Sequence, residues 1–144
     1  MAVEPGVVDA NVLVYALDIS APQHAASRAL LEAARARETT LYITLQILCE
    51  FYSVVTNARR VSKPRSAAEA RSTIAGLRDF LEVLSVPANI LDVWLELLRL
   101  HPVTGPDVFD LQIVATMQAN GVRRIYTFNV DDFRGFSELM AVTP

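Results

Sequence analysis

Acidic and amide side chains recur in four separated segments of this chain, centred on Asp9, Glu50, Asp110 and residues 129–132. No lysine or arginine directly flanks the first three. Carboxylates brought together without cations repel one another, so such a cluster normally serves to bind a hard divalent cation. If the fold gathers these segments into one pocket, they suit metal-dependent chemistry on phosphate esters.

Asp9 directly follows the apolar residues 6–8, and this pattern predicts a short buried strand over 6–9. An aspartate in this position can cap a helix that begins near Ala10, by accepting hydrogen bonds from backbone N–H groups. It can also bind a metal ion. The two roles are compatible, because one carboxylate oxygen can cap while the other acts as a ligand.

Glu50 lies within a helix predicted for residues 45–58, which begins after Thr44 as its N-cap. The helix is apolar almost all round, which predicts burial, and a buried carboxylate must find a partner or lose its charge. A stripe that simply faces solvent remains the alternative. The stripe consists of polar residues at helical spacing: Gln46, Glu50, Ser53 and Asn57.

Asp107 and Asp110 lie one turn apart in a helix expected to run from the cap Thr104 to Asn120. Asp107 is three residues after Thr104, the spacing of a capping box, and this structural role accounts for it. Asp110 lies too far into the helix to cap it. We therefore expect Asp110, not Asp107, to be a ligand.

The run 129–132 follows a strand predicted for residues 124–127, and Asn129 lies nearest the end of that strand. Asn and Asp are also common turn formers, so a plain loop is the alternative. Asn129 is expected to contribute to the site. Whether Asp131 or Asp132 contributes in its place stays open.

A basic stretch follows the predicted Glu50 helix, and its cations could grip a phosphate backbone or simply end the helix in solvent. It contains Arg59, Arg60, Lys63 and Arg65. The single Cys49 excludes an internal disulfide and is expected to be buried. His24 and His101 are expected to lie away from the acids.

Short apolar segments alternate with helical ones, which predicts an α/β fold with a mostly parallel sheet covered on both faces. Ligands bind such sheets outside the carboxyl ends of the strands, where Asp9 and Asn129 are expected. The whole chain, 1–144, is expected to form one domain. Strands are predicted at 6–9, 41–43, 83–86, 124–127 and 139–142, and helices at 12–17, 22–37, 45–58, 67–80, 87–100 and 105–120.

The composition is that of a globular protein, with 52% hydrophobic residues, a formal net charge of −3 and a single cysteine. A mean hydropathy of +0.30 indicates either an unusually apolar core or an apolar patch covered by a partner. Both are expected, and the apolar excess suggests a homodimer. Neither a signal peptide nor a membrane span is expected, so the predicted location is the cytoplasm. No P-loop, dinucleotide fingerprint, nucleophile elbow or zinc motif is present.

The order and spacing of these segments resemble the PIN-domain family, and within it the VapC-type toxins of toxin–antitoxin pairs. The likeness runs from about residue 7 to residue 136. Each matching piece alone is weak, but their order and spacing together are specific to this family. The matching pieces are residues 7–11, Glu50 in its apolar helix, residues 109–116 and residues 126–133.

The resemblance implies a three-layer α/β/α sandwich and a Mg²⁺- or Mn²⁺-dependent endoribonuclease that hydrolyses RNA phosphodiester bonds. Asp9, Glu50 and Asp110 match the acids that bind metal in this family, and Asn129 falls on the fourth catalytic position. An uncharged residue there weakens the case for a second tightly held metal. Asn11 matches a small polar position that often supports the first acid.

The resemblance also implies a cognate antitoxin protein as a partner. Two other functions stay open: a catalytically weak PIN scaffold that binds RNA or protein without cleavage, and a DNA-directed nuclease. A receiver-like signalling domain also gathers acids at strand ends. It is disfavoured, because it needs a lysine after the fifth strand and Lys63 is the only lysine in the chain.

Overall fold

A five-stranded sheet forms the centre of the molecule, and the computed structural model describes residues 2–144. The strands lie in the order β3-β2-β1-β4-β5 and every neighbouring pair is parallel. The sheet is therefore wholly parallel. Its strands are β1 (Gly6–Val8), β2 (Leu41–Ile43), β3 (Glu82–Val83), β4 (Arg124–Tyr126) and β5 (Met140–Val142).

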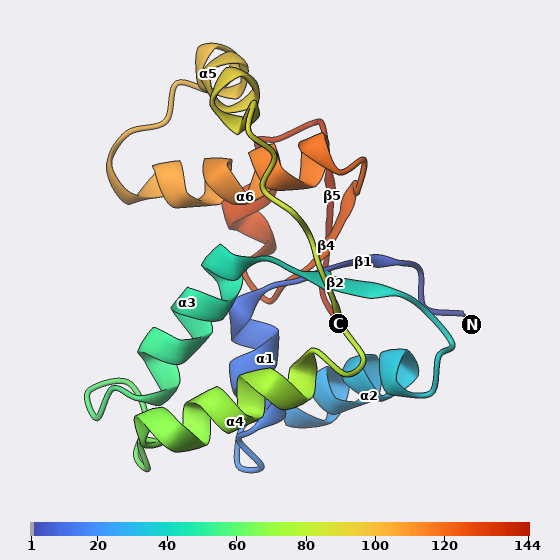
Figure 1. Cartoon of the computed structure of the whole chain (residues 1–144), viewed down its shortest axis with the longest axis vertical. Coiled ribbons are helices and arrows are strands. Elements are labelled where there is room, and N and C mark those ends of the chain that lie inside the picture. The colour runs from blue at the N-terminus through green and yellow to red at the C-terminus, as the bar shows by residue number, and fades with distance from the viewer. Residues whose placement is uncertain (1) are drawn as a thin grey trace.

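Helices cover both faces of this sheet, which confirms the predicted three-layer α/β/α sandwich (Figure 1). The four helices before β3 lie on one side of the sheet, and α5 and α6 pack together on the other. The helices are α1 (Ala10–Ala16), α2 (His24–Arg35), α3 (Leu45–Val55), α4 (Ala67–Leu77), α5 (Ile90–Leu100) and α6 (Val108–Ala119), with 3₁₀ turns η1 (Gly105–Asp107) and η2 (Val130–Phe133).

The central strands are mostly apolar, apart from Arg124 at the start of β4, because helices cover both of their faces. Their side chains are excluded from solvent at Val7, Val8, Leu41, Ile43 and Ile125. Burial of such side chains contributes roughly 1.5–3 kcal/mol each. A core of this kind holds the strand ends in fixed positions, and these ends carry the acids.

The predicted helix starts are confirmed where a capping side chain precedes the helix. The hydroxyl of Thr44 accepts a hydrogen bond from the N–H of Ile47 at the start of α3. Ser66 and Glu69 form a reciprocal capping box at the start of α4. These bonds satisfy N–H groups that lack a partner within the helix.

The capping box predicted for Thr104 and Asp107 is wrong. Neither side chain makes a capping hydrogen bond, and the 3₁₀ turn η1 precedes α6. Thr104 has the extended backbone of an N-cap residue (φ −132°, ψ 156°), but a 3₁₀ turn follows it and α6 begins only at Val108, so the spacing of an α-helical capping box is lost. Gly105, with φ +60°, starts this tight turn. Asp107 is therefore exposed and does not cap the helix.

Two further predictions need correction. The strand expected at 83–86 is only Glu82–Val83, because the chain leaves the sheet before Val86, which is 52% exposed. Helix α3 is not buried all round, since it packs mainly on α1 and leaves its other face open. Leu45 is 65% exposed on that face and Cys49 is exposed as well.

The strand order reverses between β1 and β4, because the chain first builds the sheet towards β3 and then returns to the far side of β1. Such a switch point leaves a crevice beyond the carboxyl ends of the two strands. Asp9 directly follows β1, and Asn129 lies three residues after the end of β4. Among residues 2–144, no helix is both long and apolar enough to span a bilayer.

Candidate metal centre

A groove of about 1010 Å³ opens at this switch point. The first three predicted site residues reach it from three different elements: Asp9 from the start of α1, Glu50 from α3 and Asp110 from α6. Asn129, from the loop after β4, also lines it. The fold thus brings together all four predicted side chains, which lie up to 120 positions apart in the chain.

Asp9 uses both of its carboxylate oxygens for hydrogen bonds and is only 7% exposed. Oδ1 accepts from the N–H of Ala10 at 2.8 Å, which confirms the predicted helix cap. Oδ2 accepts from Thr127 Oγ1 at 2.8 Å and Asn11 Nδ2 at 3.3 Å. Burial raises the pKa of Asp9 against these hydrogen bonds, and the charge of Asp132 raises it further.

Asn11 and Thr127 form a small polar network that joins the ends of β1 and β4. Thr127 is fully buried and accepts from the N–H of Asn129 at 3.0 Å and from Asn11 Nδ2 at 3.1 Å. Asn11 Oδ1 accepts from the N–H of Phe128 at 3.1 Å. Thr127 was not among the predicted site residues, although a hydroxyl directly after a buried strand is a visible signal in the sequence.

Thr127→Val is expected to destabilise the protein by about 1–3 kcal/mol, because the buried Asp9 carboxylate loses a donor and two N–H groups lose an acceptor. Thr127→Ser keeps the hydroxyl and is expected to lose much less. Chemical denaturation of both variants measures the difference. Equal stabilities of the two variants would show that Thr127 contributes packing rather than this hydrogen bond.

Glu50 is half-buried and faces the groove together with Gln46 and Ser53. Gln46 Nε2 donates to Glu50 Oε1 at 3.1 Å and to the carbonyl oxygen of Phe109 at 2.8 Å, so one amide links α3 to α6. Burial raises the pKa of Glu50, the Gln46 bond opposes this, and the charge of Asp9 adds to it. The polar stripe therefore faces the groove until Asn57, which is exposed beyond it.

Asp110 is the most strongly perturbed carboxylate of the groove. Burial, followed by the negative charges of Asp132, Asp9, Glu50 and Asp107, raises its pKa to about 7. Four anionic neighbours and no compensating cation make this a site of concentrated negative charge. A bound cation or a proton on one of these carboxylates would offset the repulsion.

The two neighbouring aspartates of η2 differ in direction. Asp131 pairs with Arg134 at 2.7 Å on the surface and is 79% exposed. Asp132 lines the groove, and its charge raises the pKa of both Asp9 and Asp110. The sequence left the choice between these residues open, and the geometry favours Asp132 as the acid that joins the cluster.

The donor set of this cluster fits a hard divalent ion, since every available ligand atom is a carboxylate or amide oxygen. Within residues 2–144, no three acid, histidine or cysteine side chains already stand close enough to enclose a metal. Separation across the groove is expected of mutually repelling carboxylates. Metal binding by Asp9, Glu50 and Asp110 thus stays a prediction, supported by shared location and charge.

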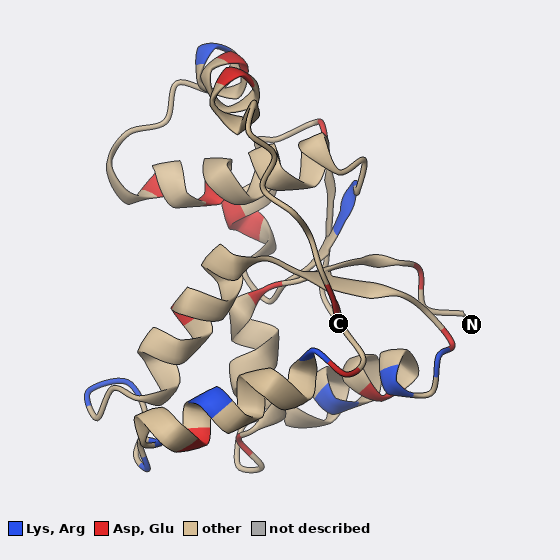
Figure 2. Cartoon of the chain, in the orientation of Figure 1, with Lys and Arg blue, Asp and Glu red and all other residues tan. Residues whose placement is uncertain are grey.

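The opposite end of the groove is cationic. Arg60, Lys63 and Arg65 line it, and they come from the loop that joins α3 to α4. Figure 2 shows this basic loop well separated from the acidic residues that gather where α6, α3 and the start of α1 face one another. Arg59, which the sequence grouped with them, is exposed and is absent from the groove lining.

Comparisons with known proteins agree with this architecture. A family profile described as PIN domain matches residues 6–139. Ribonuclease VapC24 of Mycobacterium tuberculosis is 27% identical over 132 residues, which cover 90% of this chain and 89% of that protein.

Solved structures share the fold. The VapBC2 structure from Rickettsia felis, bound to a DNA fragment from its promoter, aligns with a TM-score of 0.67 and 20% identity over 99% of both chains. Mycobacterium tuberculosis VapC20, described as a sarcin–ricin loop cleaving toxin, aligns with a TM-score of 0.68 and 17% identity over 96% of this chain and 98% of its own. At these identities the likeness concerns the fold.

Proposed function

The chain belongs to the PIN-domain family, and from this premise we propose that it is a divalent-metal-dependent endoribonuclease and the toxin of a VapBC-type toxin–antitoxin pair. We also propose that residues 1–144 form a single PIN domain that acts in the cytoplasm. The observation that carries the proposal is the groove itself, in which four acids without cationic partners face one another at the switch point of the sheet. The similarity to Ribonuclease VapC24 over most of both chains supports an RNA substrate.

Asp9, Asp110 and Glu50 are the proposed ligands of Mg²⁺ or Mn²⁺. A bound divalent ion would activate a water molecule and offset the charge that develops on the phosphate. Asp9 is preoriented by its bonds to Ala10 and Thr127, so little reorganisation is needed to present Oδ2 to the groove. Asn129 offers an amide that can contact the substrate without adding charge.

The groove is acidic at one end and cationic at the other, and this charge distribution suits a bound RNA strand. A phosphate near the carboxylates is repelled unless metal is present, whereas Arg60 and Lys63 attract phosphates further along the strand. A strand that spans both ends is therefore anchored by cations and presented to the acids. This arrangement explains how a chain of net charge −3 can bind a polyanion.

The double variant Arg60→Ala/Lys63→Ala is expected to weaken RNA binding by about tenfold at low salt and to flatten its salt dependence, because fewer counterions are released. Fluorescence anisotropy with a single-stranded RNA over a range of salt concentrations measures both effects. Arg59→Ala is the matched control, since that cation lies outside the groove. Equal losses in the control and the double variant would contradict a groove-bound RNA.

Exposed apolar side chains support the proposed protein partners. Leu91 and Leu95 on α5 are 60% and 50% exposed, and Phe109 beside the groove is 56% exposed. Faces of this kind suit a homodimer contact and an antitoxin segment. The VapBC2 likeness adds support for the antitoxin.

A PIN scaffold that binds RNA without cutting it is the second candidate function, because Asn129 supplies no charge at the fourth position. A cleavage assay on single-stranded RNA, titrated with Mg²⁺ or Mn²⁺ and then with a chelator, separates the two. The proposed nuclease produces metal-dependent fragments that cease on chelation. Binding without fragments at any metal concentration would favour the scaffold.

A further inference from the structure

A second cavity, of about 260 Å³, lies beside the groove and shares Asp110 and Asp132 with it. Its remaining walls include His101, Val103 and Phe136, which follow α5 and η2 in the chain. The expectation that His101 lies away from the acids is therefore wrong. Because the cavity adjoins the carboxylates, a nucleotide next to the bond held there could place its base inside it.

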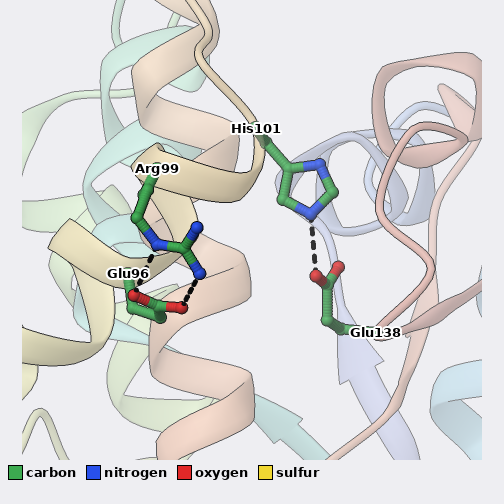
Figure 3. Close-up of polar contacts among 4 residues, drawn as sticks. All are labelled: Glu96, Arg99, His101 and Glu138. Carbon is green, nitrogen blue, oxygen red and sulfur yellow. Dashed lines mark hydrogen bonds and ion pairs between the residues drawn. The ribbon is translucent and has the colours of Figure 1, made fainter.

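His101 is fixed in this cavity on two sides. Its Nε2 lies 2.7 Å from Glu138 Oε1 (Figure 3). Its ring centroid lies 4.7 Å from that of Phe136. The second oxygen of Glu138 is buried and has no hydrogen-bond partner among residues 2–144. Arg99 does not compete for this carboxylate, because it pairs with Glu96.

Glu138 orients the imidazole of His101 and is not a surface side chain, since both side chains are about four-fifths buried (19% and 21% exposed). A buried carboxylate oxygen without a hydrogen-bond partner costs free energy on folding. With Nε2 held by Glu138, the second ring nitrogen of His101 is left available to a ligand. The ring also offers an aromatic surface beside Phe136.

The rest of the cavity wall is largely acidic, since Asp107, Asp110, Asp131 and Asp132 all line the cavity. Asp131 is engaged by Arg134, whereas Asp107 takes part in none of the ion pairs formed by residues 2–144. A phosphate is repelled from such a wall. A neutral group that carries N–H donors is attracted, because carboxylates accept hydrogen bonds and cannot donate them.

We propose that this cavity binds one nucleobase of the RNA and prefers a base with an exocyclic amino group. The inference rests on the proposed function and adds a specificity-determining site to it. The small volume suits one planar ring system, and single-stranded RNA is read by stacking on aromatic side chains and by hydrogen bonds to base edges.

Asp107 is the proposed acceptor of the amino group. Guanine is expected to bind most tightly, because its ring N–H and amino group can both donate to one carboxylate. Uracil is expected to bind most weakly, because it has no amino group and turns carbonyl oxygens towards the acids. An arginine side chain of a protein partner would also be attracted to the acids, but it would leave the imidazole without a hydrogen-bonding role.

The test uses nuclear magnetic resonance of the whole protein in Mg²⁺, titrated separately with the four ribonucleoside 5′-monophosphates, with guanosine and with arginine amide. The ring signals of His101 and the amide signal of Gly135 report on the cavity, because both residues line it. Guanosine monophosphate and guanosine are expected to shift both signals. Uridine monophosphate is expected to bind at least about tenfold more weakly.

Asp107→Asn is expected to remove most of this tenfold preference, since the amide no longer offers two equivalent acceptor oxygens. Asp92→Asn, an exposed aspartate on α5, is the matched control and should leave it unchanged. Equal binding of the guanine and uracil nucleotides, or shifts with arginine amide alone, would overturn the inference. The readout needs no cleavage, so a protein that fails to cut RNA but binds guanosine here would refute the nuclease and not the cavity.

Discussion

Asp110→Asn is expected to lower metal-dependent RNA cleavage by about 10³-fold or more, because the variant loses a charged ligand from the centre of the acidic cluster. The same change is expected to stabilise the metal-free protein. Removal of one negative charge relieves the repulsion exerted on Asp110 by Asp132, Asp9 and Glu50. Opposite effects on activity and stability distinguish a metal ligand from a residue that maintains the fold.

The pH dependence of this stabilisation follows from the pKa of Asp110, which is raised from 3.8 to about 7. Because the folded pKa is the higher one, ionisation opposes folding, and the penalty is absent below the unfolded value and complete above the folded value. The side chain is only partly buried, so solvent screens part of the repulsion. Above pH 7, Asp110→Asn is expected to raise the free energy of unfolding of the metal-free protein by about 1–2 kcal/mol.

Thermal or chemical unfolding of the chelated wild type and variant, from pH 4 to pH 8, measures this difference. The gap is expected to widen as the pH rises. RNA cleavage is assayed on the same preparations with Mg²⁺ restored. A folded Asp110→Asn variant that still cleaves RNA at the wild-type rate would remove Asp110 from the site.

The neighbouring variants Asp132→Asn and Asp131→Asn are expected to behave differently although they change adjacent residues in the same way. Asp132 faces the groove, and its charge acts on Asp9 and Asp110, so its loss should lower cleavage by about 10- to 100-fold. Asp131 pairs with Arg134 at the surface, where ion pairs contribute little. Its loss should change cleavage by less than about twofold.

Mn²⁺ titration by calorimetry, together with cleavage rates, checks this pair of variants. Weaker metal affinity is expected only for Asp132→Asn. The reverse order, with Asp131→Asn as the inactive variant, would mean that the turn η2 presents its acids differently in solution.

The sequence predicted the alternation of strands and helices because buried parallel strands and capped helices have strong local signals. Thr44 and Ser66 each precede their helix at the position where a hydroxyl can cap it, and both predictions are confirmed. The Thr104 cap failed because spacing alone does not reveal backbone angles, and Gly105 and Pro106 form a tight turn instead. Exposure of Cys49 was equally hidden, because it depends on which helices pack against α3.

The candidate site was predicted through isolated acids in apolar surroundings, and the groove gathers all of them. What could not be predicted was the direction of side chains within a polar run. Asp131 and Asp132 are adjacent residues of the same type, so the sequence does not distinguish them. The turn η2 directs Asp131 to Arg134 and Asp132 to the groove. The link between His101 and Glu138 spans 37 positions and has no local signal at all.

Anomalous diffraction from crystals soaked in Mn²⁺ locates any metal ion that the acids of the groove bind. We expect a strong peak in the groove within coordination distance, about 2–2.2 Å, of carboxylate oxygens of Asp9 and Asp110, and no such peak in Asp110→Asn crystals. A peak confined to another part of the molecule, or one that persists unchanged in the variant, would contradict this expectation.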